Sequence, residues 1–551
     1  MQDLRSVEPR LPPHFLTFLR HAAEARNAGQ SEAMAIWLKA AAYLHDTDTS
    51  AIVELMDELI RVGQPWFSVE LGELATRLGY DAPTLQFGLG YALQSTGRHA
   101  EATVAYRRAL AVDPEYPQLR NNLASAIRMS HGDLQEAFAL LEEAVAANPE
   151  EVNAWINLVN ARRERHDLEG AHAAGVRALE LAPGNAAAAN NHSLTLKDAQ
   201  RWSEADQYAK TACSLDPDNA TYRFNQGILH LMQGRYAEGW PGFEDRWLGA
   251  MELRGARPIF PVPRWRGESL KGKTLFVWGE QGFGDVLQFC RFIPMLAERV
   301  HAQGGRIIWN SFPQVGNLLV RSLGRHVDGY TVGGGIESLP ACDYEFPLMS
   351  LPFALKLDEA TIQSTGPWLV SDPTLHAAWK TQLAAEPRLK VGLAWTGSLT
   401  HRRNACRRVG WERYAAHFHD LQDVVFYSLQ PGAAADVSAA RDAGLDLVDL
   451  TASFATFDHT AAFIDSLDLV ITVCTSVAHL SGAIGQRTWV LLDANPHWPW
   501  QLERTDSPWY PTATLYRQHE FAHWEPVLET VTQDLRSLAA AHKIRTQRVL
   551  P

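Results

Sequence analysis

The chain has 551 residues, 46% of them apolar and 21% charged, with a formal net charge of −13 from 50 basic and 63 acidic side chains. Such a length is too great for one hydrophobic core and predicts two to four domains. The acidic balance argues against a general nucleic-acid-binding protein.

The cysteine spacing and the length of the apolar runs indicate in which cellular compartment the protein resides. Five cysteines stand alone, without CxxC or CxxH spacing, which favours a reducing environment over a disulfide framework or a zinc site. The first residues, MQDLRSVEPRLPPHF, have no apolar stretch behind their early charges, and no apolar run reaches the ~18 residues of a membrane helix. We therefore expect a cytoplasmic protein without a membrane span.

A period of 34 or 35 residues runs through the first half of the sequence. Two series follow it: Pro114, Pro149, Pro183 and Pro217, and Ala102, Ala137, Ala171, Ala205 and Gly239. Each of the four alanines has a second alanine seven residues later, about two helical turns on, so small side chains line one helix face and let the next helix approach. The alternative interpretation is an irregular helical bundle whose periodicity arose by chance.

This pattern resembles the tetratricopeptide repeat family, and residues 83–116 are the best single unit. The resemblance implies an array of helix pairs over residues 81–250 that binds a peptide or protein in its groove. Residues 1–80 also read as helices but lack a clean phase, so they are degenerate repeats or an N-terminal cap. Gly175 and Ala209 replace large family residues, which predicts loose packing there.

After Arg235 the repeat gives way to strands, and we expect a domain boundary between about 250 and 272. The runs LFVW, RIIWN, VGLAW, VVFYSL, LDLVDL, LDLVITV and TWVLL alternate with helical stretches. Alternation of this kind predicts parallel sheets covered by helices. We divide the region into two doubly wound halves, residues 251–370 and 371–551, with ligands bound at the carboxyl ends of the strands.

The first candidate loop, GEQGFGD at residues 279–285, joins the strand at 274–278 to a helix. Gly282 and Gly284 permit close backbone approach, and the helix N-terminus favours a nearby anion or hydroxyl. On composition alone, Asp285 reads as an N-terminal helix cap.

Two further loops carry polar and basic residues. The second loop, residues 395–408, holds five basic side chains: His401, Arg402, Arg403, Arg407 and Arg408. They suit a phosphate-bearing ligand or form a solvated basic loop. In the third loop, CTSVAH at 474–479, Thr475 and Ser476 offer an anion site at a helix start, although such residues are also common caps. Without other information, His479 reads as a core residue.

Taken in this order, the three loops resemble the bacterial heptosyltransferase-like glycosyltransferases of family 9. They are most similar to bacterial proteins that append such a domain to tetratricopeptide repeats. The similar segments span most of residues 265–518 and include WRGESLKGKTLFVWGEQGFGDVLQF and DLVITVCTSVAHLSGAIGQRTWVLL. The resemblance implies an α + α/β chain: a repeat α-solenoid followed by a GT-B-like pair of Rossmann-like domains.

The resemblance also implies site residues. Asp285 matches the proposed catalytic base, which takes a proton from an acceptor hydroxyl that attacks the anomeric carbon of the donor. The donor-binding residues it implies are Gly282, Gly284, Trp395, Thr396, Gly397, Arg408, Gln430, Thr475, Ser476 and His479. Cys474 departs from the family, which usually has an acidic residue there, and this puts the donor, or activity itself, in question.

No metal or cofactor is expected beyond the nucleotide-sugar substrate. Two DxD matches, at residues 46–48 and 216–218, lie between helices of the N-terminal region and read as structural. The leading hypothesis is transfer of a sugar onto an acceptor recruited by the repeats, for example a surface or flagellar protein subunit. The alternatives are a non-catalytic adaptor with a decayed transferase domain, and a transferase acting on a lipid-linked or oligosaccharide acceptor.

Overall fold

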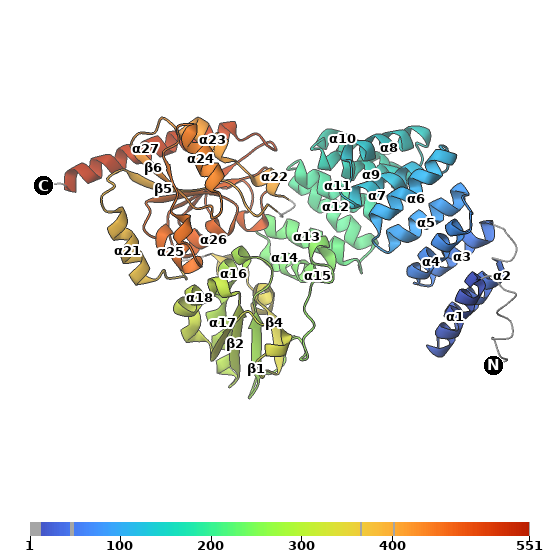
Figure 1. Ribbon diagram of the computed structural model, residues 1–551. Coiled ribbons are helices and arrows are strands. Elements are labelled where there is room, and N and C mark those ends of the chain that lie inside the picture. Colours follow the sequence, from blue (N-terminus) through green and yellow to red (C-terminus); the bar gives the residue numbers. More distant parts are fainter. Residues whose placement is uncertain (1–12, 44–48, 364–365, 400–402, 550–551) are drawn as a thin grey trace. The chain divides into compact units, whose positions relative to one another are not determined.

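The computed structural model describes residues 13–43, 49–363, 366–399 and 403–549. It divides into two compact units, one ending at Leu196 and one beginning at Lys197. A helical repeat array comes first and an α/β region with parallel sheets follows, as predicted (Figure 1). No helix within these described ranges is both long and apolar enough to cross a membrane.

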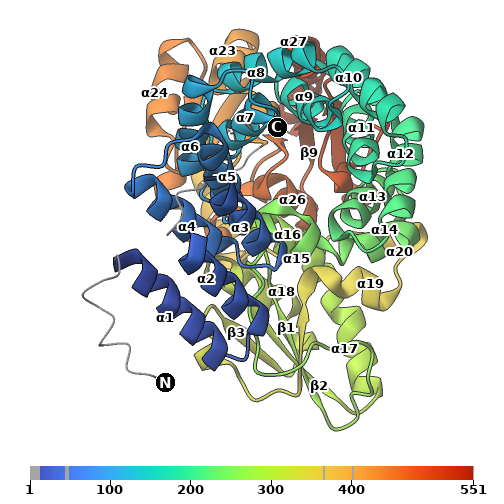
Figure 2. The same ribbon diagram turned by 90° about the vertical axis from the view of Figure 1, so that its right-hand side faces the viewer.

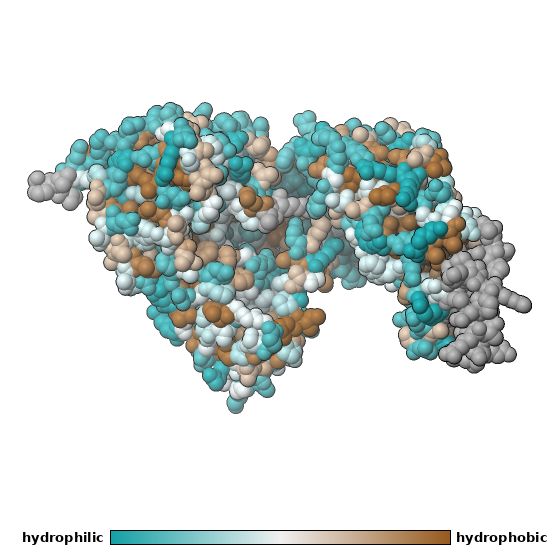
Figure 3. All heavy atoms as spheres, in the orientation of Figure 1, coloured by the Kyte–Doolittle hydropathy of each residue, from teal (hydrophilic) through white to brown (hydrophobic). Residues whose placement is uncertain are grey.

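The first unit is a row of helix pairs. They are α1 (Pro13–Asn27) with α2 (Ser31–Tyr43), α3 (Thr49–Arg61) with α4 (Pro65–Arg77), α5 (Pro83–Ser95) with α6 (His99–Val112), α7 (Leu119–Met129) with α8 (Leu134–Ala147), and α9 (Val152–Glu164) with α10 (Leu168–Leu181), followed by α11 (Ala186–Asp198). The eight repeat alanines predicted to face neighbouring helices are all buried. Hydrophilic side chains cover much of the visible surface of this unit, with small apolar patches between them (Figure 3).

The turns inside the helix pairs reveal a phase that the proline and alanine series did not. Seven left-handed residues lie 34 or 35 positions apart: Gly29, Gly63, Gly97, His131, His166, Gln200 and Gly234. Gly29 and Gly63 extend the period into the region where the sequence showed no clean phase. Because glycine adopts positive φ at no steric cost, these two turn residues were the sequence signal that favours degenerate repeats.

Gly175 is not loosely packed, contrary to expectation. A Cβ added to it would lie 2.3 Å from Nδ1 of His192, so the imidazole of α11 fills the space that a large side chain occupies elsewhere. Ala209 is also buried, at 4% exposure. Packing depends on both helices, which single positions do not reveal.

The second unit starts with the last repeat helices, α12 (Trp202–Leu215), α13 (Ala220–Met232), α14 (Tyr236–Phe243) and α15 (Arg246–Gly249). A four-stranded parallel sheet, ordered β3-β2-β1-β4, follows. Its elements are β1 (Thr274–Trp278), α16 (Phe283–Phe289), α17 (Ile293–Ala302), β2 (Arg306–Ser311), α18 (Gly316–Leu323), β3 (Gly329–Val332), β4 (Tyr344–Pro347), α19 (Leu351–Leu355) and α20 (Glu359–Ile362).

A six-stranded parallel sheet, ordered β10-β9-β8-β5-β6-β7, completes the chain. Its elements are α21 (Pro373–Leu383), β5 (Leu389–Ala394), α22 (Asn404–Arg407), α23 (Trp411–Phe418), β6 (Val424–Ser428), α24 (Ala434–Asp442), β7 (Leu447–Val448), α25 (Phe457–Ile464), β8 (Leu469–Val473), α26 (Ser476–Ala483), β9 (Thr488–Leu492), β10 (Ala513–Arg517) and α27 (Glu525–Val549).

Each sheet has one point where the strand order reverses. In the first sheet, β2 lies on one side of β1 and β4 on the other; in the second, β6 lies on one side of β5 and β8 on the other. Open parallel sheets bind ligands outside the carboxyl ends of the strands at such a switch point. The three candidate loops follow β1, β5 and β8, so they occupy both switch points.

The fifth repeat, counted from the unit at residues 83–116 and formed by α13 and α14, packs into the core of the second unit. Tyr236, Trp240 and Phe243 of α14 share one hydrophobic cluster with residues of both sheets, and the Trp240 indole donates to the carbonyl of Leu357 at 2.9 Å. The repeat pattern in the sequence therefore continues to about residue 250, whereas the second compact unit already begins at Lys197. The last repeat helices thus belong to the second unit.

Candidate functional site

The loop after β1 places Asp285 at the start of α16. Its Oδ2 accepts a hydrogen bond from the Gly282 N–H at 3.0 Å, so the carboxylate does cap the helix. The pKa of Asp285 is raised to about 6, mainly by burial and in smaller part by nearby Glu280, while the Gly282 N–H and Arg246 oppose the rise. A carboxylate that is ionised at pH 7 with a pKa near neutrality suits a proton acceptor. Capping and base chemistry are thus compatible.

A buried ion pair that sequence reasoning missed holds this loop. Arg246 of α15 is 0% exposed and donates to both carboxylate oxygens of Glu280, at 3.0 and 2.7 Å. Glu280 also accepts the Met349 N–H at 3.0 Å, and Arg246 donates to Ser350 Oγ at 2.8 Å. The pair ties α15, which directly follows the fifth repeat, to the loops after β1 and β4.

Helices α16 and α26 pack against each other through Gly284. A Cβ added there would lie 2.9 Å from Cδ2 of His479 and 3.6 Å from Cα of Ser476. Asp285 follows Gly284 directly and contributes to the raised pKa of Tyr510, which contacts His479. The structure therefore brings Asp285, Ser476 and His479 together.

His479 is buried and uncharged. Burial, with a smaller contribution from Arg407, lowers its pKa to about 3. Its Nδ1 lies 2.7 Å from the Tyr510 hydroxyl, and its ring stacks on Trp500 with centroids 5.3 Å apart. Since the phenol can donate to Nδ1, Nε2 is left as a hydrogen-bond donor, without positive charge.

Residues at the end of β5 have separate roles. The Trp395 side chain is fully buried and its indole donates to Asp436 at 2.9 Å, so it belongs to the domain core. The Thr396 N–H points to Gln430 Oε1 at 3.4 Å. Asn404, which the sequence did not single out, donates to Thr396 Oγ1 at 2.9 Å and accepts the Gly397 N–H at 3.0 Å. Asn404 thus fixes the loop.

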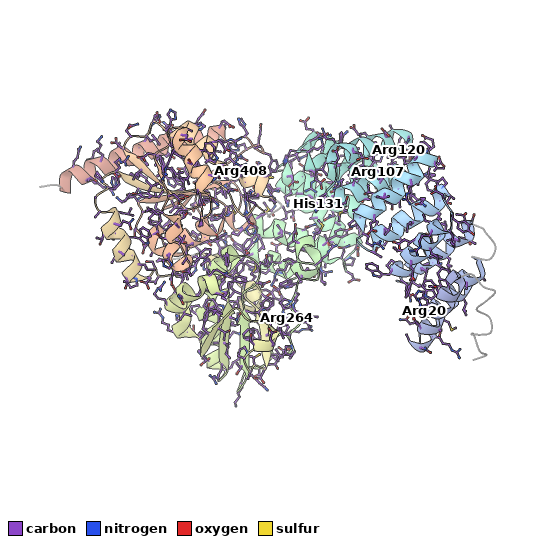
Figure 4. The ribbon with its side chains drawn as sticks, viewed as in Figure 1. Arg20, Arg107, Arg120, His131, Arg264 and Arg408 are labelled. Carbon is purple, nitrogen blue, oxygen red and sulfur yellow. The ribbon has the colours of Figure 1, made fainter. Side chains whose placement is uncertain are left out.

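The basic cluster is divided between two surfaces. Arg407 donates to the Cys474 carbonyl at 2.8 Å, and Arg403 contacts Asp493 at 3.1 Å. Arg408 is instead half exposed and pairs with Glu412 at 3.3 Å (Figure 4). His401 and Arg402, like the DxD match at 46–48, lie outside the described residues. Arg407, the neighbour of the predicted Arg408, is the cation beside the third loop.

At the end of β8, Thr475 is the N-cap of α26 and accepts the Val477 N–H at 3.2 Å. Cys474 Sγ accepts a hydrogen bond from the Trp500 indole at 3.0 Å, and burial raises the pKa of the thiol. The uncharged thiol is therefore a packing and hydrogen-bonding group. Trp500 thus lies beside both Cys474 and His479.

A cavity of about 590 Å³ lies elsewhere, lined by Asp468, Arg487 and His542 among others. Asp468 and Arg487 immediately precede β8 and β9, so this cavity is at the amino ends of the strands. It lies opposite the end where parallel sheets bind ligands.

The repeat unit carries a row of asparagines. Asn122, Asn157 and Asn191 are 35 and 34 residues apart on α7, α9 and α11, helices on the inner side of the curved row (Figure 2). The Asn157 amide donates to Asn121 at 2.8 Å, Asn121 to Asn122 at 3.3 Å and Asn190 to Asn191 at 3.1 Å. Buried Asn121 and Asn190 thereby orient half-buried amides that have further donor and acceptor capacity.

Comparisons with known proteins agree with the repeat array. A family model described as tetratricopeptide repeat matches residues 87–144, 127–186 and 190–251, so the chain contains tetratricopeptide repeats, which are typical of protein interaction. Protein FlbA of Caulobacter vibrioides is 26% identical over 511 residues, covering 82% of this chain and 84% of that protein.

Similar solved structures cover about a third of the chain. The Pseudomonas aeruginosa pilF structure covers 38% of this chain and 95% of its own, at 18% identity and a TM-score of 0.32. TTC0263, a TPR protein of Thermus thermophilus, covers 32% and 96%, at 22% identity and a TM-score of 0.29.

Proposed function

We propose that the chain is a glycosyltransferase that moves a sugar from a nucleotide-activated donor onto an acceptor held by the repeats. Asp285 accepts the proton of the acceptor hydroxyl, the hydroxyl oxygen bonds to the anomeric carbon, and the nucleotide phosphate leaves with the bonding electron pair. Arg407 and the N-terminus of α26 are the groups in place to stabilise that phosphate.

The observation that carries the proposal is the contact between the two switch points. Gly284 of α16 lies against His479 of α26, so a carboxylate from the first sheet and an anion-binding helix end from the second line one site. With a pKa of about 6, Asp285 is ionised at pH 7 and remains basic enough to take a proton. His479 supports the donor as a neutral hydrogen-bond donor, because burial keeps its imidazole uncharged.

For the acceptor, the asparagine row favours a polypeptide in an extended conformation. Packed helices lie about 8–10 Å apart, and an extended polypeptide advances about 3.3 Å per residue. Successive asparagines are therefore spaced to contact every third residue of the bound polypeptide. Amide side chains pair with main-chain N–H and C=O groups regardless of sequence. A protein acceptor is therefore favoured over a lipid-linked one.

A non-catalytic adaptor is the second candidate, because the thiol of Cys474 is already paired with Trp500 and His479 carries no charge. The test is a thermal-shift screen with UDP-, GDP-, CMP- and ADP-linked sugars, since a ligand that binds the native state raises Tm. We expect one nucleotide class to raise Tm and to support labelling of a protein acceptor. No shift with any donor and no transfer would favour the adaptor.

A further inference from the structure

Trp500 fixes the inner wall of the candidate site. Its side chain is fully buried, its ring stacks on His479, and its indole N–H donates to Cys474 Sγ. Any movement of Trp500 therefore alters the surroundings of both His479 and Cys474. What holds Trp500 is the residue that follows it.

Gln501 has a backbone conformation that residues with a Cβ avoid. Its φ of 52° and ψ of −164° lie in a region that is essentially reserved for glycine. Such a conformation persists only where the surrounding contacts over-determine it. Gln501 is 5% exposed, so those contacts come from the protein interior.

The contacts come from the fifth repeat and from two arginines. The Gln501 amide donates to the Tyr236 hydroxyl at 3.1 Å, and Arg504 donates to its Oε1 at 2.6 Å. Arg517 donates to the main-chain carbonyls of Gln501 and Trp500, at 2.9 and 2.5 Å. A Cβ at Gly234, in the repeat's own turn, would lie 2.7 Å from the Gln501 amide nitrogen, so the turn closes directly over it.

Tyr236 serves both ends of the same loop. Its hydroxyl also accepts the Trp509 indole N–H at 2.8 Å, and Tyr510, the next residue, bonds to His479. We propose that Tyr236 of the fifth repeat and the strained Gln501 form a latch that positions Trp500 against His479 and Cys474. The fifth repeat is then a structural part of the candidate donor site, and Tyr236 and Gln501 are positioning residues.

Two substitutions at one position separate the latch from ordinary side-chain loss. Gln501→Ala removes the amide but keeps the backbone strain, whereas Gln501→Gly removes both. Trp500 should therefore move in the alanine variant and stay in place in the glycine variant. Tyr236→Phe, which removes the hydroxyl alone, should behave like the alanine variant.

The readout is alkylation of Cys474 in the full-length protein, mapped by mass spectrometry, because the Trp500 indole covers this thiol. Gln501→Ala and Tyr236→Phe should raise its rate about tenfold, the scale of one buried hydrogen bond lost. Gln501→Gly should stay within about twofold of wild type. Buried Cys290, at 0% exposure, reports global unfolding in the same sample.

Glu503 provides the matched control, because it is exposed and also has a positive φ, 51°, in the same loop. Glu503→Ala and Glu503→Gly should leave Cys474 alkylation unchanged. An unchanged rate in Gln501→Ala, or an equal rate in Gln501→Ala and Gln501→Gly, would overturn the latch.

The second readout, affinity for the donor found in the nucleotide-sugar screen, rests on the proposed function. Gln501→Ala should weaken it about tenfold and Gln501→Gly should restore it. If alkylation follows the prediction while even the wild-type protein binds no nucleotide sugar, the latch stands and the transferase proposal falls.

Discussion

The fifth repeat and the repeats before it share one sequence period but differ in what covers them. Gly175, Ala209 and Phe243 are successive positions of one 34-residue series. Gly175 accommodates a neighbouring histidine, whereas Phe243 packs among Trp240 and Trp498 in the core of the α/β region. The same helix-pair pattern can therefore form part of a repeat array or part of the hydrophobic core of the α/β region. Which of the two it forms depends on the side chains that pack against it.

The charges differ in the same way. Arg107 pairs with Glu136 on the outer helices of the array, with both side chains a third exposed or more (Figure 4). Arg246, just after the fifth repeat, pairs with Glu280 and both side chains are almost fully buried. Exposed pairs contribute about 0–1 kcal/mol, whereas breaking a buried pair costs about 3–5 kcal/mol. We therefore expect substitutions in the second unit to change sugar transfer and stability, and substitutions in the first unit to change partner binding.

The largest effect is expected from Asp285→Asn, which keeps the size of the side chain but removes the charge that accepts a proton. Sugar transfer should fall ~10²–10⁴-fold, while the free energy of unfolding at pH 7 should fall by no more than about 1 kcal/mol, because the weakened helix cap is offset by removal of a buried charge. Initial rates and urea denaturation measure the two. Partner binding by the first unit should be unaffected.

Asp358→Asn is the matched control, because Asp358 caps α20 through the Thr361 N–H at 3.0 Å, without contact to the candidate site. Transfer by this variant should equal that of wild type. If the rate of sugar transfer by Asp285→Asn is within about threefold of the wild-type rate, Asp285 is not the catalytic base, since loss of a general base lowers the rate far more.

The next effect is on stability and compares the two ion pairs directly. Arg246→Ala leaves Glu280 buried and unpaired, so the transition of the second unit should lose about 3–5 kcal/mol. Arg107→Ala should cost less than about 1 kcal/mol. Urea denaturation, followed by tryptophan fluorescence, gives both values. Equal losses in the free energy of unfolding would mean that burial of the Arg246–Glu280 pair does not make it more stabilising than the exposed Arg107–Glu136 pair.

Sequence reasoning reached the parts of this molecule that local patterns encode. The repeat alanines and the strands at 274–278, 389–394 and 469–473 were predictable because each is a periodic or continuous apolar run. Strands β3, β4 and β10 were not, because GYTV, YEFP and ATLYR are short and contain no continuous apolar run.

The candidate site was predictable only as a set of loops. The sequence identified the loops after β1, β5 and β8, but not the partners of each side chain. Arg407 and Arg408 are adjacent and chemically identical, and only the fold directs the first to Cys474 and the second to Glu412. The Arg246–Glu280 pair joins residues 34 positions apart whose charges, in sequence, look like any others.

A smaller effect tests the asparagine row. Replacing Asn122, Asn157 and Asn191 together with alanine should weaken binding of the acceptor protein about 10- to 1,000-fold, since each hydrogen bond contributes about 0.5–1.5 kcal/mol. Fluorescence anisotropy with a peptide of the acceptor measures this, and the same peptide with N-methylated main-chain amides should bind wild type as weakly. Arg107→Ala, on the outer helix α6, is the control and should bind normally. Full affinity in the triple variant would exclude main-chain recognition by this row.

The smallest effect is the pH dependence of stability, where Asp285 and His479 act in opposite directions. The fold raises the pKa of Asp285 from an ordinary 3.8 to about 6, so the native state binds more protons than the unfolded state between these values. The stability this contributes is complete below about pH 3.8 and is lost as the pH rises through 6. The pKa of His479 falls from 6.5 to about 3, so its contribution is complete above pH 6.5 and is lost as the pH falls through 3.

Between pH 4 and 6 the two slopes therefore oppose each other, and each is at most about 1.4 kcal/mol per pH unit. Relative to wild type, Asp285→Asn should make stability rise more steeply with pH in this window, and His479→Gln should make it rise less steeply or fall. Urea midpoints at half-unit steps, taken as differences from wild type at each pH, cancel the titration of all other groups. If Asp285→Asn leaves the slope unchanged, the carboxylate titrates near its ordinary value, and its solvent exposure outweighs the burial beside Glu280. Transfer by wild type would then be independent of pH down to about 5, because a base with an ordinary pKa stays ionised there.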